Sequence, residues 1–278
     1  MTVRLVESEA DLEFCLRVLD AVAGIPLSIE QMRQVQDRLL LHPGGGYALV
    51  NHSSVRNSAY AMVRVLPSER GRGIGSELVE AAAVSARALG TDSMWGVVRA
   101  GDEGSLRFAT ARGFVEVGRD VELTRRLAPG DGLVRDGVVE LQEEHRLGAY
   151  EVAVAAMPDM VTAGDAEARP YDAWVEQELL GPVGFVAIED GAVVGYATLQ
   201  NLGDDSHRLE HGFTGVLPAY RGRGIATALG EAQIAWAAAH GYEELTTTTG
   251  VTNVALRRQK AKLGYEERNG PILVRGPV

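Results

Sequence analysis

The sequence predicts a mixed α/β fold in two tandem domains, each with helices packed on a central mixed sheet. The first observation is an internal repeat, because Val65–Leu78 and Val216–Leu229 lie 151 positions apart and agree at nine of fourteen positions. The same offset relates three further features, namely Gly90 to Gly241, Gly113 to Gly264 and Phe114 to Tyr265. The second observation is the expected order of elements, β-α-α-β-β-β-α-β-α-β, which occurs twice. Two copies of one domain explain both.

The first domain is expected over residues 1–130. Alternating apolar residues predict strands, and apolar residues at helical spacing predict helices. Ser28, followed three residues later by Gln31, predicts the start of the second helix. The stretch 41–46 is too broken for a strand. The expected strands cover 3–6, 47–51, 59–65, 93–99 and 115–127, and the helices cover 8–22, 28–39, 74–88 and 103–112.

The second domain is expected over residues 131–278, after a turn-rich linker at 128–132. Asp190-Gly191 between two apolar runs predicts a hairpin. This domain has the fuller set of strands and also contains Glu210 and Asn253, and for these reasons it is the expected catalytic domain. The expected strands cover 138–141, 183–189, 192–200, 208–217, 244–249 and 271–275, and the helices cover 145–157, 170–180, 225–239 and 253–262.

Composition narrows the class of protein. The chain is 46% hydrophobic and 23% charged, as in soluble globular proteins, and the charged start with no long apolar run predicts a cytoplasmic protein without a membrane span. The single cysteine, Cys15, lies on an apolar stripe, so a packing role is favoured over a nucleophilic one. Residues 1–135 carry a net charge of −1 and residues 136–278 a net charge of −10. This balance argues against nucleic-acid binding and suits a cationic small molecule, although a solvated surface explains it equally well.

The repeated motif predicts an anion site at the start of a helix. Glycines allow the backbone to approach a ligand closely, and the N–H groups of the loop then point at negative charge. Arg221 and Arg223 add donors suited to phosphate oxygens. The spacing matches neither a P-loop nor a Rossmann fingerprint.

The pattern Val-Leu-Pro-x-x-Arg-Gly-Arg-Gly-Ile-Gly/Ala, followed by a helix, a strand and a Gly-aromatic pair, resembles the GNAT N-acetyltransferase superfamily. The resemblance covers both domains and implies that the loop cradles the pyrophosphate of acetyl-CoA. Domains of this family usually have a strand and a tight turn in the place of residues 41–46, so the first domain is expected to be trimmed, and it is expected to be non-catalytic. No metal site is expected. The resemblance implies cofactor contacts at Val216, Leu217, Arg221, Gly222, Arg223, Gly224, Ile225, Ala226 and Thr227, and in the first copy at Val65, Arg70, Gly71, Arg72, Gly73, Gly75 and Ser76.

Acetyl transfer to an amine needs a base, an oxyanion donor and, for some thiols, an acid. Glu210 lies six residues before Val216, where some members of the resembled family have a general base. The alternatives are a surface carboxylate and the adjacent His211, which strand parity turns the other way. The first copy has Ala59 at this position. The oxyanion donor implied by the resemblance is a backbone N–H near Val216 or Leu217.

Two further positions carry open alternatives. Many family members have a tyrosine that serves as the general acid four residues before the Gly-aromatic pair. At this position the present chain has Lys260 and, in the first copy, Ala109. Lys260 could protonate the leaving thiolate, whereas the simpler expectation is a solvated helix lysine. Asn253 is either a contact for the pantetheine arm of acetyl-CoA or a helix N-cap, and Asp102 is its counterpart.

The function predicted from these residues is transfer of an acetyl group from acetyl-CoA to a primary amine of a small cationic molecule. The first two helices of the second domain would supply an acidic and aromatic acceptor wall. Its expected members are Asp159, Asp172, Trp174, Glu176 and Glu178. The alternatives are a non-catalytic acyl-CoA-binding or sensory protein and a protein in which both domains are catalytic, and the oligomeric state stays open.

Overall fold

The computed structural model describes residues 3–24, 27–53, 55, 57–159, 170–202 and 207–278. The chain forms two compact units, of which the first comprises Met1–Arg119 with Pro271–Val278 and the second comprises Asp120–Gly270. The units therefore do not divide at residue 130. The reason is that β6 (Val115–Arg126) begins in the first unit and ends in the second, whereas β12 (Glu266–Pro277) does the reverse.

The sheet of the first unit has the strand order β1-β2-β3-β4-β5-β12. The β4–β5 pair is parallel and the other pairs are antiparallel. The expected trimming is wrong, because Leu39–His42 forms a buried strand that pairs with the next one, and the Pro-Gly stretch is only the turn between them. The strands before β6 are β1 (Arg4–Leu5), β2 (Leu39–His42), β3 (Gly46–His52), β4 (Ser58–Val65) and β5 (Ser93–Val98).

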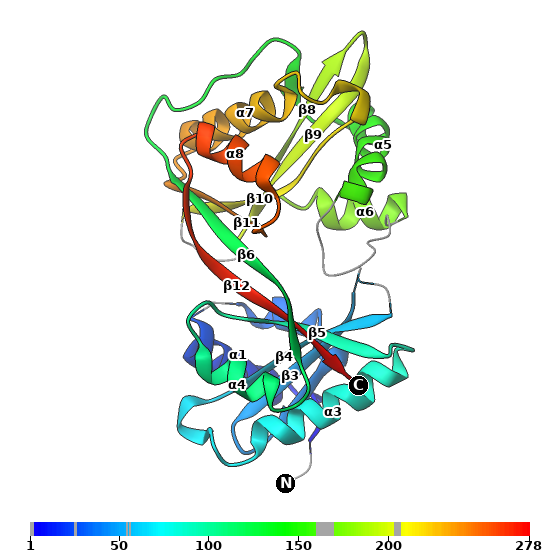
Figure 1. Cartoon of the computed structure of the whole chain (residues 1–278), viewed down its shortest axis with the longest axis vertical. Helices are drawn as coiled ribbons and strands as arrows, with labels where there is room; N and C mark the ends of the chain where they lie inside the picture. The colour runs from blue at the N-terminus through cyan, green and yellow to red at the C-terminus, as the bar shows by residue number, and fades with distance from the viewer. Residues whose placement is uncertain (1–2, 25–26, 54, 56, 160–169, 203–206) are drawn as a thin grey trace. The chain divides into compact units, whose positions relative to one another are not determined.

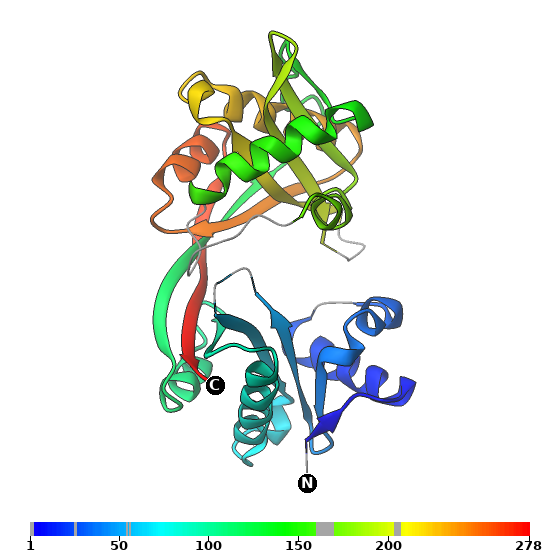
Figure 2. The same cartoon turned by 90° about the vertical axis from the view of Figure 1, so that its right-hand side faces the viewer.

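Helices cover both faces of this sheet (Figure 2). The capping box at Ser28 and Gln31 is confirmed, but α2 ends at Arg33 because residues from Leu39 onward join the sheet. The helices are α1 (Glu9–Ala23), α2 (Ile29–Arg33), α3 (Ile74–Ala88) and α4 (Glu103–Thr110).

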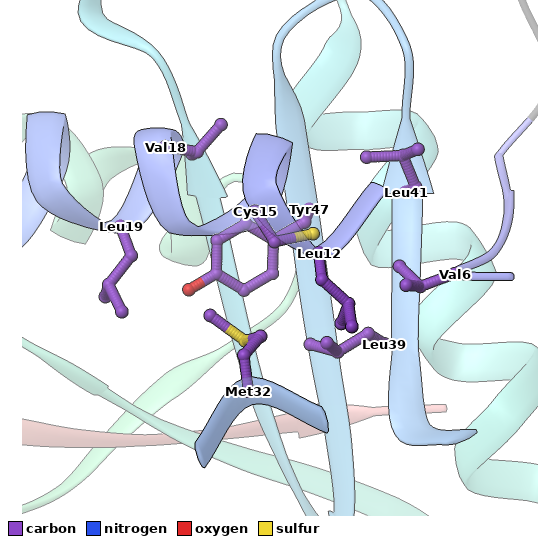
Figure 3. Close-up of a cluster of buried hydrophobic side chains, with 9 residues drawn as sticks. All are labelled: Val6, Leu12, Cys15, Val18, Leu19, Met32, Leu39, Leu41 and Tyr47. Atoms are coloured by element: carbon purple, nitrogen blue, oxygen red, sulfur yellow. The ribbon is translucent and has the colours of Figure 1, made fainter. Parts of the chain in front are cut away.

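Cys15 lies inside the apolar cluster between α1, α2 and the strands β2 and β3, beside Tyr47 (Figure 3). Its side chain is fully buried, and burial raises the pKa of its thiol to about 12. A thiol that stays protonated is a poor nucleophile. The packing role expected for this cysteine is thus the one that the structure supports.

The second unit repeats the same topology with the strand order β7-β8-β9-β10-β11-β6. The hairpin at Asp190-Gly191 is confirmed, with φ of 50° and 78° at its two turn residues. In Figure 1, α7 and α8 lie on one side of this sheet and α5 and α6 on the other. The strands are β7 (Val138–Glu140), β8 (Val183–Glu189), β9 (Ala192–Asn201), β10 (Arg208–Val216) and β11 (Glu244–Gly250), and the helices are α5 (Arg146–Ala156), α6 (Tyr171–Glu178), α7 (Ile225–Ala239) and α8 (Val254–Lys262).

The predicted fold class, two tandem α/β domains with a mixed sheet, is confirmed. The two units have the same number and order of strands when the end of β12 is counted with the first unit and the end of β6 with the second. Of the helices that the structure describes, none has the length and apolar character needed to cross a bilayer.

Strand β12, whose C-terminal end belongs to the first unit, is expected to stabilise that unit. Ile272 is 8% exposed and packs with Val98 and Val274. Replacing Ile272 with alanine removes buried methyl groups and is expected to cost about 3 kcal/mol, measured by denaturant unfolding. Val115→Ala is the matched control, because Val115 is 62% exposed and its truncation is expected to change stability by less than about 0.5 kcal/mol. Equal effects of the two changes would contradict a buried role for β12.

Candidate functional site

Each copy of the glycine–arginine motif forms the same loop between a strand and a helix. After β10, Pro218–Tyr220 make one 3-10 turn, and Gly222 and Gly224 follow with φ of 76° and 85° before α7 begins. In the first copy, Gly71 and Gly73 have φ of 79° and 89° before α3. Residues with a Cβ rarely adopt such angles. The backbone conformation is therefore repeated along with the sequence.

Both loops present free backbone donors. Within the described part of the chain, the N–H groups of residues 71–75 and 222–225 do not donate to any backbone carbonyl. Among the described residues other than the adjacent ones, none has a heavy atom within 4 Å of the place that a Cβ would take on any of the four loop glycines. An open group of N–H donors at a helix N-terminus has the geometry that binds phosphate oxygens.

The loop arginines fall into two kinds. Arg70 and Arg221 each donate from Nε to the carbonyl oxygen of the valine that ends the preceding strand, Val65 at 3.4 Å and Val216 at 3.0 Å. Arg72 is ion-paired with Glu69. Arg223 likewise pairs with Glu189 at 3.0 Å, so the second arginine of each loop already has a carboxylate partner.

Several other predicted contact residues serve the packing of the fold. The N–H of Leu217 donates to the carbonyl of Val194 at 2.9 Å, so it is not available as an oxyanion donor. Ile225 is 9% exposed and belongs to the core cluster under α7. The carbonyl of Ala226 accepts a hydrogen bond from Gln259, at 2.9 Å.

Three further predicted cofactor contacts are small residues in the first turns of helices α3 and α7. The structure packs Gly75 against the ring of Phe108, where a Cβ would come within 3.0 Å of two ring carbons. Ser76 accepts a hydrogen bond from Arg112. Thr227 is half-buried in the first turn of α7.

Asn253 caps helix α8. Its Oδ1 accepts from the N–H of Leu256 at 3.2 Å, and its Nδ2 donates to Thr249 at 3.0 Å. Asp102 caps α4 in the same way, accepting from the N–H of Ser105 at 2.9 Å. Of the two alternatives expected for Asn253, the helix cap is therefore observed.

A cavity of about 680 Å³ lies in the first unit. It begins at Arg70 and Gly71 of the loop and continues between β4 and β5. These strands are paired only from Ser58 to Tyr60 and then separate, which opens the sheet. β10 and β11 of the second unit likewise pair only over Arg208–Glu210. Several lining residues were not predicted from the sequence, among them Tyr60, Met62, Arg64, Arg99, Phe108 and Arg112. Strand parity before the loop places Tyr60, Met62 and Arg64 on one face of the strand, and this is the signal that could have identified them.

Glu210 lies in β10 where the paired part of β10 and β11 ends, opposite Thr246. The side chain is half-buried. Burial raises the pKa of its carboxyl, and the negative charge of Glu122 raises it further. A carboxylate whose pKa is shifted toward neutrality is a better proton acceptor than an exposed one.

His211 points into a buried hydrogen-bonded chain, which makes it a poorer candidate for the base than Glu210. The amide of Gln233 donates to the carbonyl of Thr198 at 2.8 Å, which leaves its Oε1 to accept from His211 Nδ1, 3.0 Å away. Nε2 of His211 then accepts from the hydroxyl of Tyr265. Burial lowers the pKa of His211 well below its usual value, so the imidazole stays neutral.

Lys260 is not the solvated helix lysine that was expected. Its side chain is 2% exposed, and its Nζ lies 4.7 Å from the centre of the Tyr265 ring. Burial lowers the pKa of its amine to about 7. This group therefore changes protonation near neutral pH.

Burial of the Lys260 amine predicts that folding stability depends on pH. Between pH 7 and pH 10.5 the unfolded chain holds a proton on Lys260 that the folded chain has lost, so folding stability rises with pH across this window. A shift of this size corresponds to roughly 4 to 5 kcal/mol in total. Lys260→Met is expected to lack this rise and to be more stable than the wild type at the acidic end, measured by denaturant unfolding at several pH values. Parallel pH profiles for the two proteins would contradict the burial of the amine.

The expected acceptor wall is only partly present. Asp172 and Glu176 on α6 are exposed, whereas Trp174 is 5% exposed and donates to the hydroxyl of Tyr196 within an aromatic core. Glu178 accepts from the N–H of Phe213 at 3.0 Å, where a bulge interrupts β10. The side chain of Asp159 lies outside the described residues.

Comparisons with known proteins agree with this architecture. The sequence matches the acetyltransferase (GNAT) family over residues 44–114 and 149–265. No curated protein matches the chain in sequence. A GCN5-related N-acetyltransferase from Sphaerobacter thermophilus superposes with a TM-score of 0.75 at 19% identity, covering 99% of this chain and 95% of that chain.

Two further solved structures share the fold. A tandem GNAT protein from the clavulanic acid biosynthesis pathway superposes with a TM-score of 0.77 at 18% identity, over 99% of this chain and 97% of that one. A glucosamine N-acetyltransferase region of a fungal multi-domain β-N-acetylglucosaminidase gives 0.76 at 17% identity, over 98% of this chain and 38% of that one. The chain belongs to the GNAT acetyltransferase family and is a tandem member of it, as its repeat predicted.

Proposed function

We propose that the protein is an acetyl-CoA-dependent N-acetyltransferase that acetylates a primary amine of a small cationic molecule. Acetyl-CoA binds at the glycine–arginine loops, and the second unit carries out the transfer with Glu210 as general base. The observation that supports this most directly is the cavity of about 680 Å³ that runs from the loop at Gly71 between the separated strands β4 and β5.

The cavity suits a long ligand with an anionic end. Free N–H groups and Arg70 face one end, where phosphate oxygens would be held. Beyond the loop the α3 side of the lining is apolar and includes Ile74, Val79 and Ala82, which suits an uncharged arm. The N–H groups, glycine angles and strand separation recur in the second unit, which supports a second site of the same chemistry.

In the second unit, Glu210 would take the proton from the attacking amine. The amine must lose a proton as it attacks the thioester carbonyl, and a carboxylate with a raised pKa accepts it near neutral pH. The sulfur leaves as a thiolate, and Lys260, with a pKa of about 7, is the group that we assign to protonate it.

The acceptor class is inferred from charge. Asp172 and Glu176 are exposed on α6 in a half of the chain that carries a net charge of −10. Replacing both with lysine is expected to raise the KM of a cationic amine at least about tenfold while leaving kcat within about twofold, because rim charges act on encounter and binding. An unchanged KM would remove α6 from the acceptor site.

Calorimetry and a thiol-release assay test the proposal together. Titration of acetyl-CoA into the intact protein is expected to show saturable binding, and its stoichiometry tells whether one or both loops are used. Thiol release is then measured with diamines, aminoglycosides and amino acids as acceptors. Absence of acetyl-CoA binding would overturn the proposal.

A non-catalytic acyl-CoA-binding protein is the second candidate, and one observation favours it. Small or apolar residues that line the first cavity are replaced in the second unit by larger polar ones that are buried. By the 151-residue offset, Ala82 corresponds to Gln233, Ala109 to Lys260 and Phe114 to Tyr265. Acetyl-CoA binding at one site without thiol release for any amine would support this candidate.

A further inference from the structure

The cavity of the first unit reaches both faces of the sheet. Met62 packs in the cluster formed with α1 and α2, whereas its neighbours Ala61 and Val63 pack in the cluster formed with α3. All three residues line the cavity, and so does Val22 near the end of α1. A ligand held by the loop at the start of α3 can therefore extend between β4 and β5 to the α1 face.

The α1 face of the cavity carries two guanidinium groups, those of Arg64 and Arg99. Arg64 is half-buried, and its Nε contacts the sulfur of Met62 at 3.2 Å. Arg99 is exposed and donates to the carbonyl oxygen of Ala23, at the end of α1, over 3.5 Å. Neither forms an ion pair with a described carboxylate, in contrast with the arginines Arg72 and Arg223 of the loops.

The carboxylates that line the cavity are already used elsewhere. Glu69 is paired with Arg72 beside the loop. Asp102 caps α4 and holds the N–H and hydroxyl of Ser105 at 2.9 and 2.6 Å. The charge of Arg99 contributes to the lowered pKa of Asp102, but only after these hydrogen bonds. The α1 face thus keeps an excess of positive charge.

Tyr60 adds a further donor beside Arg64. Its ring is held edge-on against Trp95, with ring centres 4.9 Å apart, and Trp95 is fixed by a hydrogen bond to Ser53 at 2.6 Å. Burial raises the pKa of Tyr60 while the charge of Arg64 opposes that rise, so the hydroxyl stays protonated close to the guanidinium. A guanidinium group has more donors than these contacts use, and such a group with a hydroxyl donor beside it suits a carboxylate.

We infer that the α1 face of this cavity binds a carboxylate group of its ligand through Arg64 and Arg99, with Tyr60 as a third donor. The inference rests on the proposed function, because acetyl-CoA or another acyl-CoA is the ligand that enters from the loop. The carboxylate has two possible sources. It is either the far end of a dicarboxylic acyl group on CoA or the carboxylate of an amino acid that binds on the α1 face beside the acyl group.

Two pairs of matched ligands distinguish the sources. Succinyl-CoA and butyryl-CoA have four-carbon acyl groups that end in a carboxylate and a methyl group, and both are titrated into the intact protein by calorimetry. L-Leucine and L-leucinamide differ in the same way and are titrated into the protein saturated with acetyl-CoA. The member of one pair that carries a carboxylate is expected to bind at least about tenfold more tightly.

Variants assign the preference to the arginines. Arg64→Gln and Arg99→Gln are each expected to reduce the ratio of affinities within the preferred pair to about one. Arg87→Gln is the control, because Arg87 is exposed in the last turn of α3 and does not line the cavity. Thermal unfolding checks that each variant is folded, and binding of the ligand without a carboxylate shows that the cavity is intact.

The outcomes separate this inference from the proposed function. If acetyl-CoA does not bind the wild type, the proposed function fails and this inference fails with it. If acetyl-CoA binds but neither pair shows a preference for the carboxylate, the inference alone is overturned. A preference that survives in both Arg64→Gln and Arg99→Gln also overturns it.

Discussion

Replacing Gly73 with glutamate is expected to weaken acetyl-CoA binding to the first unit at least about 100-fold, which corresponds to roughly 2.7 kcal/mol. Gly73 is the residue before α3, with φ of 89°, and it stands among N–H groups that have no backbone acceptor. A side chain there is strained and places a carboxylate where phosphate oxygens would sit. Calorimetric titration of acetyl-CoA measures the effect.

Gly90→Glu separates this effect from strain and charge alone. Gly90 has φ of 77° and equally open surroundings, but it follows the opposite end of α3. The control is expected to lose some stability and to keep wild-type affinity. Gly224→Glu, compared with Gly241→Glu, asks the same question of the second unit. Equal affinities for Gly73→Glu and Gly90→Glu would show that the loop does not hold the anionic end of the ligand.

The repeat made most of this fold predictable from the sequence. The motif fixes the loops through glycines that need positive φ, and the Asp190-Gly191 turn and the Ser28 capping box are local features that their own residues determine. Such features depend on a few neighbouring residues. Turns, caps and loops of this kind can therefore be predicted without knowledge of the rest of the chain.

The sequence did not predict which strands pair with each other when they lie far apart along the chain. The pattern of residues 271–275 identifies a strand, but nothing in it says that this strand pairs with β5, whose residues lie far earlier in the chain. The boundary predicted at residue 130 failed for this reason. β2 was missed because Pro and Gly in its following turn masked a four-residue strand whose side chains are all buried.

The site was predicted in part. Strand parity correctly placed Glu210 and His211 on opposite faces of the strand, and only His211 is buried. Lys260, in contrast, was expected in solvent and is buried against Tyr265. α8 is mostly polar, so its sequence does not reveal that one lysine faces inward. The cavity depends on Ala82 and Ala109 being small, and the internal comparison with Gln233 and Lys260 is the signal that could have located it.

Glu210→Gln is expected to lower kcat for acetyl transfer about 100-fold at neutral pH, because glutamine cannot accept the proton of the attacking amine. The affinity for acetyl-CoA is expected to stay within about twofold, since the change keeps shape and leaves the loop intact. In the wild type, kcat is expected to fall as pH drops through the pKa of Glu210, which burial raises above its ordinary value. The variant is expected to lack this acidic limb, and pH–rate profiles of both proteins measure it.

Glu122→Gln is the informative partner for this variant. The charge of Glu122 is the second cause of the raised pKa of Glu210, so its removal lowers that pKa. The acidic limb is therefore expected to move to lower pH while kcat at neutral pH stays near the wild-type value. A limb that survives in Glu210→Gln, or one that does not move in Glu122→Gln, would assign the titration to another group and remove Glu210 from the mechanism.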